Sequence, residues 1–220
     1  MMFEMLQHYG PDLLTGFGVT LLSWTLGTVF GLALGFVIEI VRRFGPSLLG
    51  YPIRAYVEFI RGTPFLVQIF VLYYGGPLLG LRLDALPAGI LGLTIYGSAY
   101  FTEILRAGFD AVPKGQIEAA RAIGFANMTI VRRIMVPIMM VSALPPMVNF
   151  AIILTKETVI LSMITVPEIM FQTQTMMSET FAFFTPILIL ALFFWGFVEL
   201  ISRLGRRLER RFTYYLLDRS

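Results

Sequence analysis

The sequence predicts an all-α integral membrane protein with five transmembrane helices. Hydrophobic residues make up 57% of the 220 residues, charged residues only 14%, and the mean hydropathy is +0.78. A soluble domain carries roughly 25% charged residues, so this chain has too few to cover a water-exposed surface. Because each span needs roughly 20 residues, the chain has room for one membrane domain over residues 1–220 and not for a large soluble catalytic domain.

Five windows without Asp, Glu, Lys or Arg are each close to the length of one bilayer crossing. With their apolar flanks they predict spans over about 16–41, 55–80, 85–105, 134–155 and 180–202. The second span begins before its charge-free window because Glu58 and Arg61 interrupt only one helical stripe. The first window follows no basic segment and is longer than the apolar core of a signal peptide, so we expect it to stay as the first span.

A sixth apolar stretch, residues 158–178, contains Pro167, Glu168, Gln172 and Gln174. A span facing lipid here would leave a carboxylate in hydrocarbon, which is costly. We therefore expect irregular or re-entrant backbone that is buried in protein on one side of the membrane.

Basic residues indicate the orientation, because cytoplasmic loops carry an excess of Lys and Arg. None precedes Arg42, whereas 14 of the 17 fall in the first loop, the long loop after the third span, and the tail. We expect the amino terminus outside and the carboxy terminus in the cytoplasm. The tail also combines neighbouring basic and aromatic side chains, which suits an anchor at the membrane surface. These are Arg210, Arg211, Phe212, Tyr214 and Tyr215.

Three glycines in the first span, Gly27, Gly31 and Gly35, recur at steps of four and lie on one helix face. Such a face lets another helix approach closely. The partner is either another helix of this chain, which we favour, or a second subunit.

The loop at about 110–133 predicts two short helices. Pro113 opens the first, Gly124 ends it, and Asn127 is expected to cap the second. Ala119 and Ala120 offer a surface of small side chains that another protein can approach closely. The loop therefore has the form of a docking element.

Glu118-Ala119-Ala120 is followed after three residues by Gly124 and after nine more by Ile134-Met135-Val136-Pro137. This run resembles the EAA loop of ABC importer membrane subunits, with Val136 where Leu is usual. Further runs narrow the resemblance to the polar amino acid uptake permeases, over about residues 12–205. They are Glu58-Phe59-Ile60-Arg61-Gly62-Thr63-Pro64 with Gln68, Pro113-Lys114-Gly115-Gln116, Leu144-Pro145-Pro146 with Asn149, and Lys156-Glu157-Thr158, after which Val159 replaces the usual small polar residue.

The resemblance implies a type I importer fold in a bacterial inner membrane. It implies a pair of membrane subunits, identical or different, two ABC ATPase subunits on the cytoplasmic loops, and an outside binding protein that delivers an amino acid. No nucleic acid is expected as a partner. The resemblance also implies that the residues in contact with the ATPase are Glu118, Ala119, Ala120, Arg121 and Gly124.

The lysines also argue against ATP binding by this chain. A phosphate-binding P-loop needs Lys followed by Ser or Thr, yet Lys114 and Lys156 precede Gly and Glu. We expect no catalytic residue and no cofactor here, with ATP and Mg²⁺ in the partner. With His8 as the sole histidine and no cysteine, a metal site or a membrane enzyme is disfavoured. An ion-coupled carrier would show two homologous halves, and it competes with the importer interpretation, as does a membrane scaffold.

An amino acid is a zwitterion, so its pathway should offer polar groups of both signs within the bilayer. Lys156 or Arg61 is the candidate for the carboxylate. The candidates for the ammonium or side chain are Glu157, Glu58, Asn149, Gln68 and Gln172. Alternatively, Glu58 and Arg61, three residues apart, neutralise each other. Both interpretations stay open for Lys156 and Glu157, whereas Glu103 and Arg106 are expected to form a structural pair.

Overall fold

The structure is a computed structural model that describes the backbone of residues 2–217 and the side chains of residues 5–211. Every regular element in this range is helical. The α-helices are α1 (Met2–Phe44), α2 (Gly50–Gly62), α3 (Phe65–Phe70), α4 (Ala85–Asp110), α5 (Lys114–Ala122), α6 (Asn127–Ile130), α7 (Val136–Glu157), α8 (Ile169–Thr180) and α9 (Phe184–Leu217). Short 3₁₀ or π turns join them: η1 (Ser47–Leu49), η2 (Val71–Gly75), η3 (Gly76–Leu79), η4 (Val131–Met135) and η5 (Thr158–Ile164).

Four described helices are long and apolar enough to cross a bilayer: Met5–Phe44, Ala85–Asp110, Asn127–Ile164 and Phe184–Arg211. The pair Ser47–Gly62 and Phe65–Leu79 together can supply a fifth crossing, although it bends by 106°. The predicted all-α membrane architecture is confirmed, with four spans, or five if this bent pair crosses the bilayer as one broken span.

The bend corrects our expectation of one continuous helix over 55–80. Pro64 has no N–H to donate, and its ring forces the preceding residue out of the helical region. Thr63 is accordingly extended (φ −117°, ψ 143°). The Gln68 amide nitrogen lies 2.7 Å from the Ile60 carbonyl oxygen, 3.0 Å from that of Thr63 and 2.8 Å from Thr63 Oγ1. One side chain therefore satisfies carbonyls that the break leaves without helical donors.

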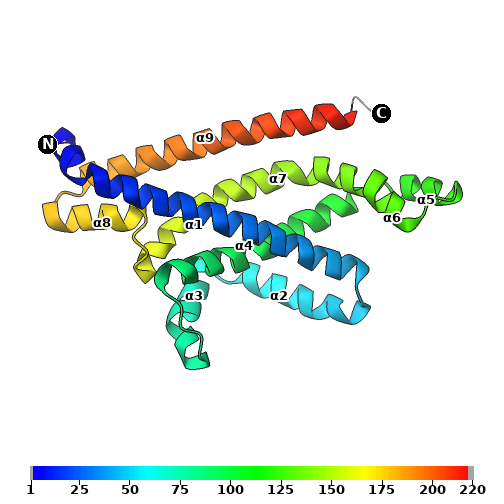
Figure 1. Cartoon of the computed structure of the whole chain (residues 1–220), viewed down its shortest axis with the longest axis horizontal. Coiled ribbons are helices and arrows are strands. Elements are labelled where there is room, and N and C mark those ends of the chain that lie inside the picture. The colour runs from blue at the N-terminus through cyan, green and yellow to red at the C-terminus, as the bar shows by residue number, and fades with distance from the viewer. Residues whose placement is uncertain (1, 218–220) are drawn as a thin grey trace.

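Helix α4 lies at the centre of the bundle and packs against α1, α2, α3 and α7 (Figure 1). Small buried residues along it, among them Gly89, Gly92, Gly97 and Ala99, let these neighbours approach closely. Large buried side chains around it form the core: Ile69, Leu93, Phe101, Leu154, Leu161 and Ile164.

The segment 158–178 is mostly helical, so the irregular alternative of our expectation is wrong, and the re-entrant alternative stays open. Turn η5 ends at Thr165, which is left-handed (φ 64°), and the chain then reverses into α8. Helix α8 packs against α1 and α9 near the amino terminus and does not cross the bundle (Figure 1). Glu168 caps α8 by accepting the backbone N–H of Phe171 at 2.9 Å, which explains why a helix begins there.

The Glu168 side chain is fully buried. Its Oε2 lies 3.5 Å from Thr20 Oγ1 on α1, and Thr20 Oγ1 accepts the Ile169 N–H at 3.1 Å. The carboxyl that the sequence made costly in lipid is thus enclosed between α1 and α8. Burial raises the pKa of Glu168 from 4.5 to about 7, against the lowering effect of hydrogen bonds from Met170, Phe171 and Thr20.

This shift predicts a pH-dependent stability. The folded protein holds the Glu168 proton more tightly than the unfolded chain, so the contribution is complete below pH 4.5 and is lost as the pH rises through about 7. We expect the unfolding temperature in detergent to fall between about pH 5 and 8 by an amount equivalent to roughly 1–3 kcal/mol. Glu168→Gln, which keeps the shape of the protonated acid, should remove that slope. An equal slope in both proteins would contradict the assignment.

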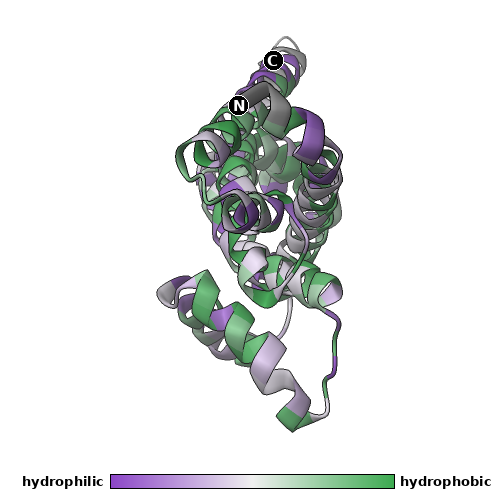
Figure 2. Cartoon of the chain, turned by 90° about the vertical axis from the view of Figure 1, so that its left-hand side faces the viewer, coloured by the Kyte–Doolittle hydropathy of each residue, from purple (hydrophilic) through white to green (hydrophobic). Residues whose placement is uncertain are grey.

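The ends of the bundle differ. The amino terminus and α8 lie at one end, whereas α5 and α6 project at the other, toward which α9 runs (Figure 1). In the view from the amino-terminal end, hydrophobic residues cover most of the helices (Figure 2). One short helical segment stands apart below the other helices in this view. In Figure 1, α3 and the turns after it are the part that projects from this lower side.

Candidate coupling loop and translocation site

The loop between α4 and α7 consists of α5 and α6 and projects beyond the other helices (Figure 1). Pro113 precedes the first turn of α5. Gly124 adopts φ 82°, the Phe125 N–H donates to the Ala120 carbonyl at 3.0 Å, and the Gly124 N–H donates to that of Arg121 at 3.0 Å. This paired closure suits glycine because other residues are strained at positive φ. Asn127 does not cap α6 as expected: the capping position is Ala126, without a side-chain bond.

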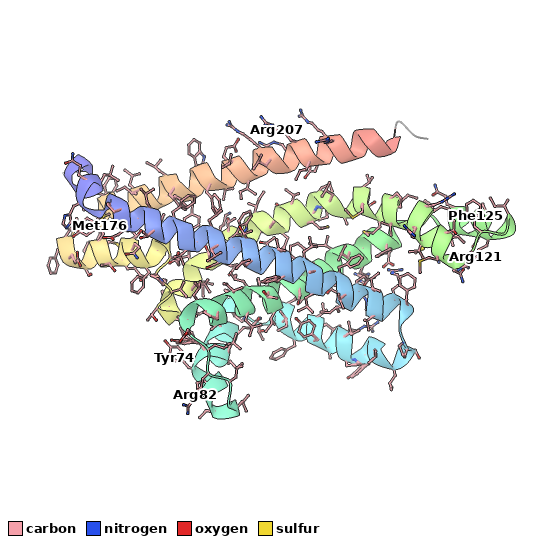
Figure 3. All side chains as sticks on the ribbon, in the orientation of Figure 1. Tyr74, Arg82, Arg121, Phe125, Met176 and Arg207 are labelled. Atoms are coloured by element: carbon pink, nitrogen blue, oxygen red, sulfur yellow. The ribbon has the colours of Figure 1, made fainter. Side chains whose placement is uncertain are left out.

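The loop exposes charged and apolar side chains that no described part of the chain covers. Glu118, Ala119 and Arg121 are exposed, and Figure 3 places Arg121 and Phe125 at the far end of the molecule. Ile123 is 73% exposed and Met128 68%. Ala120, in contrast, is buried and is not part of this exposed surface, so its expected contact with the ATPase stays a prediction.

The glycines Gly27, Gly31 and Gly35 face α4. A Cβ on Gly27 would lie 2.6 Å from Leu93 Cβ, and one on Gly31 would lie 3.3 Å from the Gly97 Cα. A Cβ on Gly35 would meet the Ser98 carbonyl oxygen at 2.8 Å. In this structure the partner of the glycine face is a helix of the same chain.

Glu58 and Arg61 do not pair with each other, contrary to the neutralising interpretation. Glu58 is exposed, whereas Arg61 Nη1 lies 3.7 Å from Glu103 Oε2 on α4. Glu103 also pairs with Arg42 of α1 at 3.1 Å and with Arg106 at 2.9 Å. One carboxylate therefore joins α1, α2 and α4.

At the start of the loop, the carboxylate of Asp110 also pairs with arginines from two helices. Asp110, the last residue of α4, accepts hydrogen bonds from Arg43 at 2.8 Å and from Arg106 at 3.1 Å. The Arg43 guanidinium carbon also lies 4.8 Å from the centre of the Phe109 ring. Asp110 thus links the start of the loop to α1 through Arg43 and to α4 through Arg106.

An aromatic row continues from Glu103 along one face of α4. Tyr96, Tyr100 and Glu103 follow one another at helical steps of four and three, and the Tyr96 hydroxyl donates to that of Tyr100 at 3.3 Å. The Tyr100 ring stacks on Phe150 of α7, and the Arg61 guanidinium carbon lies 5.4 Å from its centre. The sequence reasoning missed these tyrosines, although their period was visible.

A cavity of about 460 Å³ opens between α2, α4 and α7 beside this row. Its polar lining combines both signs of charge, from Arg61, Glu103 and Arg106, with Tyr100 and Ser142. Groups of both signs in one cavity are what a zwitterion needs.

The remaining sequence candidates lie elsewhere. The Gln68 amide nitrogen donates hydrogen bonds to the carbonyls of Ile60 and Thr63 at the bend. Lys156 and Asn149 are exposed and Glu157 is half-buried, and Lys156 and Glu157 lie at the far end of α7, roughly 20 Å from Ser142 along the helix. Gln172 packs against α1, where a Cβ on Gly16 would lie 2.7 Å from its Cγ. Of the seven candidates, only Arg61 lines the cavity.

The sequence pattern of one family matches residues 12–214, and that family is described as the binding-protein-dependent transport system inner membrane component. The chain belongs to this family. The importer-permease resemblance is confirmed at this level, and family membership implies ATPase and binding-protein partners. Among relatives of this permease is a probable amino-acid ABC transporter permease, YckA of Bacillus subtilis, 32% identical over 94% of this chain and 91% of the relative.

Another Bacillus subtilis relative, the probable glutamine ABC transporter permease GlnM, is 37% identical over 81% of this chain and 83% of its own length. The permease also superimposes on a chain of a crystal structure described as an amino acid ABC transporter with histidines. The TM-score is 0.90, with 32% identity, over 96% of this chain and 98% of that one. The type I importer permease fold is thereby established.

Proposed function

We propose that this permease is the transmembrane subunit of an ATP-driven importer that carries a polar amino acid delivered by an extracytoplasmic binding protein. The projecting α5–α6 loop, with Glu118, Ile123 and Met128 exposed, is the observation that carries this proposal. A helix that lays one such face into a groove is a common docking mode. Family membership and the amino-acid permeases among its relatives support it.

In this mechanism ATP and Mg²⁺ belong to a partner ATPase, and this chain converts the movement of the docked loops into alternating access. The loop end of the bundle faces the cytoplasm of a bacterium and the α8 end faces outside, as the distribution of basic residues favours. Movement of the loops passes through Asp110 to α1 and α4. The ATP-bound ATPase must bind one conformation more tightly than the other for this to work.

ATP hydrolysis by the purified complex in lipid tests the proposal. Binding proteins loaded with a panel of amino acids should be added one at a time. Strong stimulation by one loaded binding protein would identify the substrate. If mild extraction retains no ATPase on this chain, the importer proposal fails and an ion-driven carrier becomes the better explanation.

The cavity predicts a role for Arg61 as the group that receives the substrate carboxylate. Its guanidinium is nearly half exposed, and its 3.7 Å contact with Glu103 is the longest of the three arginine contacts to that carboxylate. Arg61→Met should lower uptake at limiting substrate roughly 10-fold or more, the cost of a lost charge-assisted hydrogen bond. Arg61→Lys should restore part of it.

Arg54→Met supplies the matched control, because Arg54 is exposed on the same helix and does not line the cavity. The measurement is radiolabelled uptake into proteoliposomes, with basal ATP hydrolysis as the check on assembly. Equal uptake by Arg61→Met and the wild type would remove Arg61 from the pathway while leaving the importer proposal intact.

A further inference from the structure

A group of four arginines lies on α9 outside the site described above. Arg203, Arg206, Arg207 and Arg210 recur at steps of three, one and three and line a surface hollow of about 180 Å³. Among the side chains described, Glu199 pairs with two of them, 2.7 Å from Arg203 and 3.5 Å from Arg206, and Glu209 lies between Arg207 and Arg210 in the sequence. The group therefore keeps a clear excess of positive charge.

The opposite side of α9 packs against α7. Gly205 is buried against α7, where an added Cβ would clash with Val148 Cγ1. Val148 is 12 residues inside the start of α7 at Val136, within the candidate membrane span Asn127–Ile164. The arginines on either side of Gly205 therefore lie beside α7, next to the end of the predicted last span at residue 202. Arginine near the end of a span extends to the headgroups, where anionic lipid attracts it.

The arginines also face away from the protein. Arg207 points outward from α9, away from α7 and α1 (Figure 3). Next to them, an apolar row at steps of four is about half exposed: Leu200 (56%), Leu204 (49%) and Leu208 (49%). A cationic hollow beside an exposed row of leucines fits a molecule with an anionic head and hydrocarbon chains.

We propose that α9 binds the phosphate of an anionic phospholipid in the leaflet on the coupling-loop side, with the acyl chains along Leu200, Leu204 and Leu208. Charge complementarity favours this occupant over a protein, because each Lys or Arg near the surface strengthens binding to anionic lipid. The bound lipid stabilises α9 beside α7. The predicted aromatic anchors Phe212, Tyr214 and Tyr215 have side chains outside the described residues, and the proposal does not depend on them.

Lipid titration of the purified full-length permease, followed by native mass spectrometry, tests the site. Phosphatidylglycerol should bind the wild type more tightly than phosphatidylcholine. Arg207→Gln with Arg210→Gln should weaken phosphatidylglycerol binding about 30-fold, since each arginine contributes roughly 1 kcal/mol. Arg54→Gln with Arg82→Gln removes the same charge elsewhere and should leave binding unchanged. Arg207→Lys with Arg210→Lys should retain most of it.

Three results would overturn the proposal. Equal weakening by the Arg54 and Arg82 control would show diffuse electrostatic attraction and no site. Equal affinity for the two lipids in the wild type would show that the headgroup charge is not recognised. Full displacement of phosphatidylglycerol by millimolar inorganic phosphate would identify a free-phosphate site. The unfolding temperature in lipid-free detergent should match between wild type and variants, which separates lost binding from lost folding.

Discussion

Glu118→Lys is expected to separate this permease from its ATPase and to abolish transport. Glu118 is exposed on α5, at the end of the molecule that projects beyond the bundle. Reversing its charge replaces an attraction with a repulsion at the proposed contact. A residue at the centre of an interface typically contributes about 2 kcal/mol or more, so the ATPase should bind at least roughly 30-fold more weakly. Uptake and stimulated ATP hydrolysis should both be lost.

Gln116→Lys is the matched control for this prediction. Gln116 is also exposed on α5 but lies on another side of the helix, two residues away. It adds positive charge to the loop without touching the proposed contact, so the ATPase should still co-purify. The fold of both variants is checked by the unfolding temperature of the permease alone. Retention of the ATPase by Glu118→Lys would show that the loop docks through other residues.

Gly35→Ala is expected to destabilise the bundle, although alanine normally favours a helix. The added Cβ would meet the Ser98 carbonyl oxygen at 2.8 Å, Phe101 Cβ at 2.9 Å and the Thr102 nitrogen at 3.0 Å. Two of these atoms are backbone and cannot turn aside. The hydrogen bond from Thr102 Oγ1 to the Gly35 carbonyl, 3.2 Å long, would also be strained. Overpacking of this kind costs about 1–3 kcal/mol, and Gly35→Leu should cost more.

Gly18→Ala on the same helix separates packing from helix propensity. No atom lies within 4 Å of a Cβ built on Gly18, so the substitution should be neutral or stabilise by up to about 1 kcal/mol. Unfolding temperatures of the wild type and both variants in one detergent provide the comparison. If Gly35→Ala is as stable as Gly18→Ala, α1 and α4 do not approach as closely as the structure shows.

The coupling loop could be predicted from local sequence, whereas most of the cavity could not. The exposed loop was visible because Pro113, Glu118 and Gly124 have the spacing of a capped helix and of a known motif. The Glu103–Arg106 pair followed from a spacing of three on a helix. The cavity could not be predicted from the sequence. Arg61 contacts Glu103, which lies on another helix, and not Glu58, which is closer to it in the sequence.

The bend at Pro64 could also be predicted only in part from the sequence. Pro64 marked a possible break, yet the length and apolarity of 55–80 favoured one continuous span. Length and apolarity are properties of the segment alone. The break is tolerated because Gln68 satisfies the freed carbonyls, a bond that needs the folded geometry. Likewise, the composition of 158–178 predicted that this stretch is buried in protein. It did not predict that Thr20 of α1 helps to enclose Glu168.

The sequence by itself determined that this chain lies in a membrane, how many segments can cross it, where the coupling loop falls and which family it belongs to. Each of these depends on the transfer free energy of one segment or on a local motif. Only the tertiary structure decided that the glycine face meets α4, that Arg61 joins Glu103, and that Gly205 packs the arginine-bearing part of α9 against Val148 of α7. Helix rotation and depth depend on packing between distant segments, which no local pattern records.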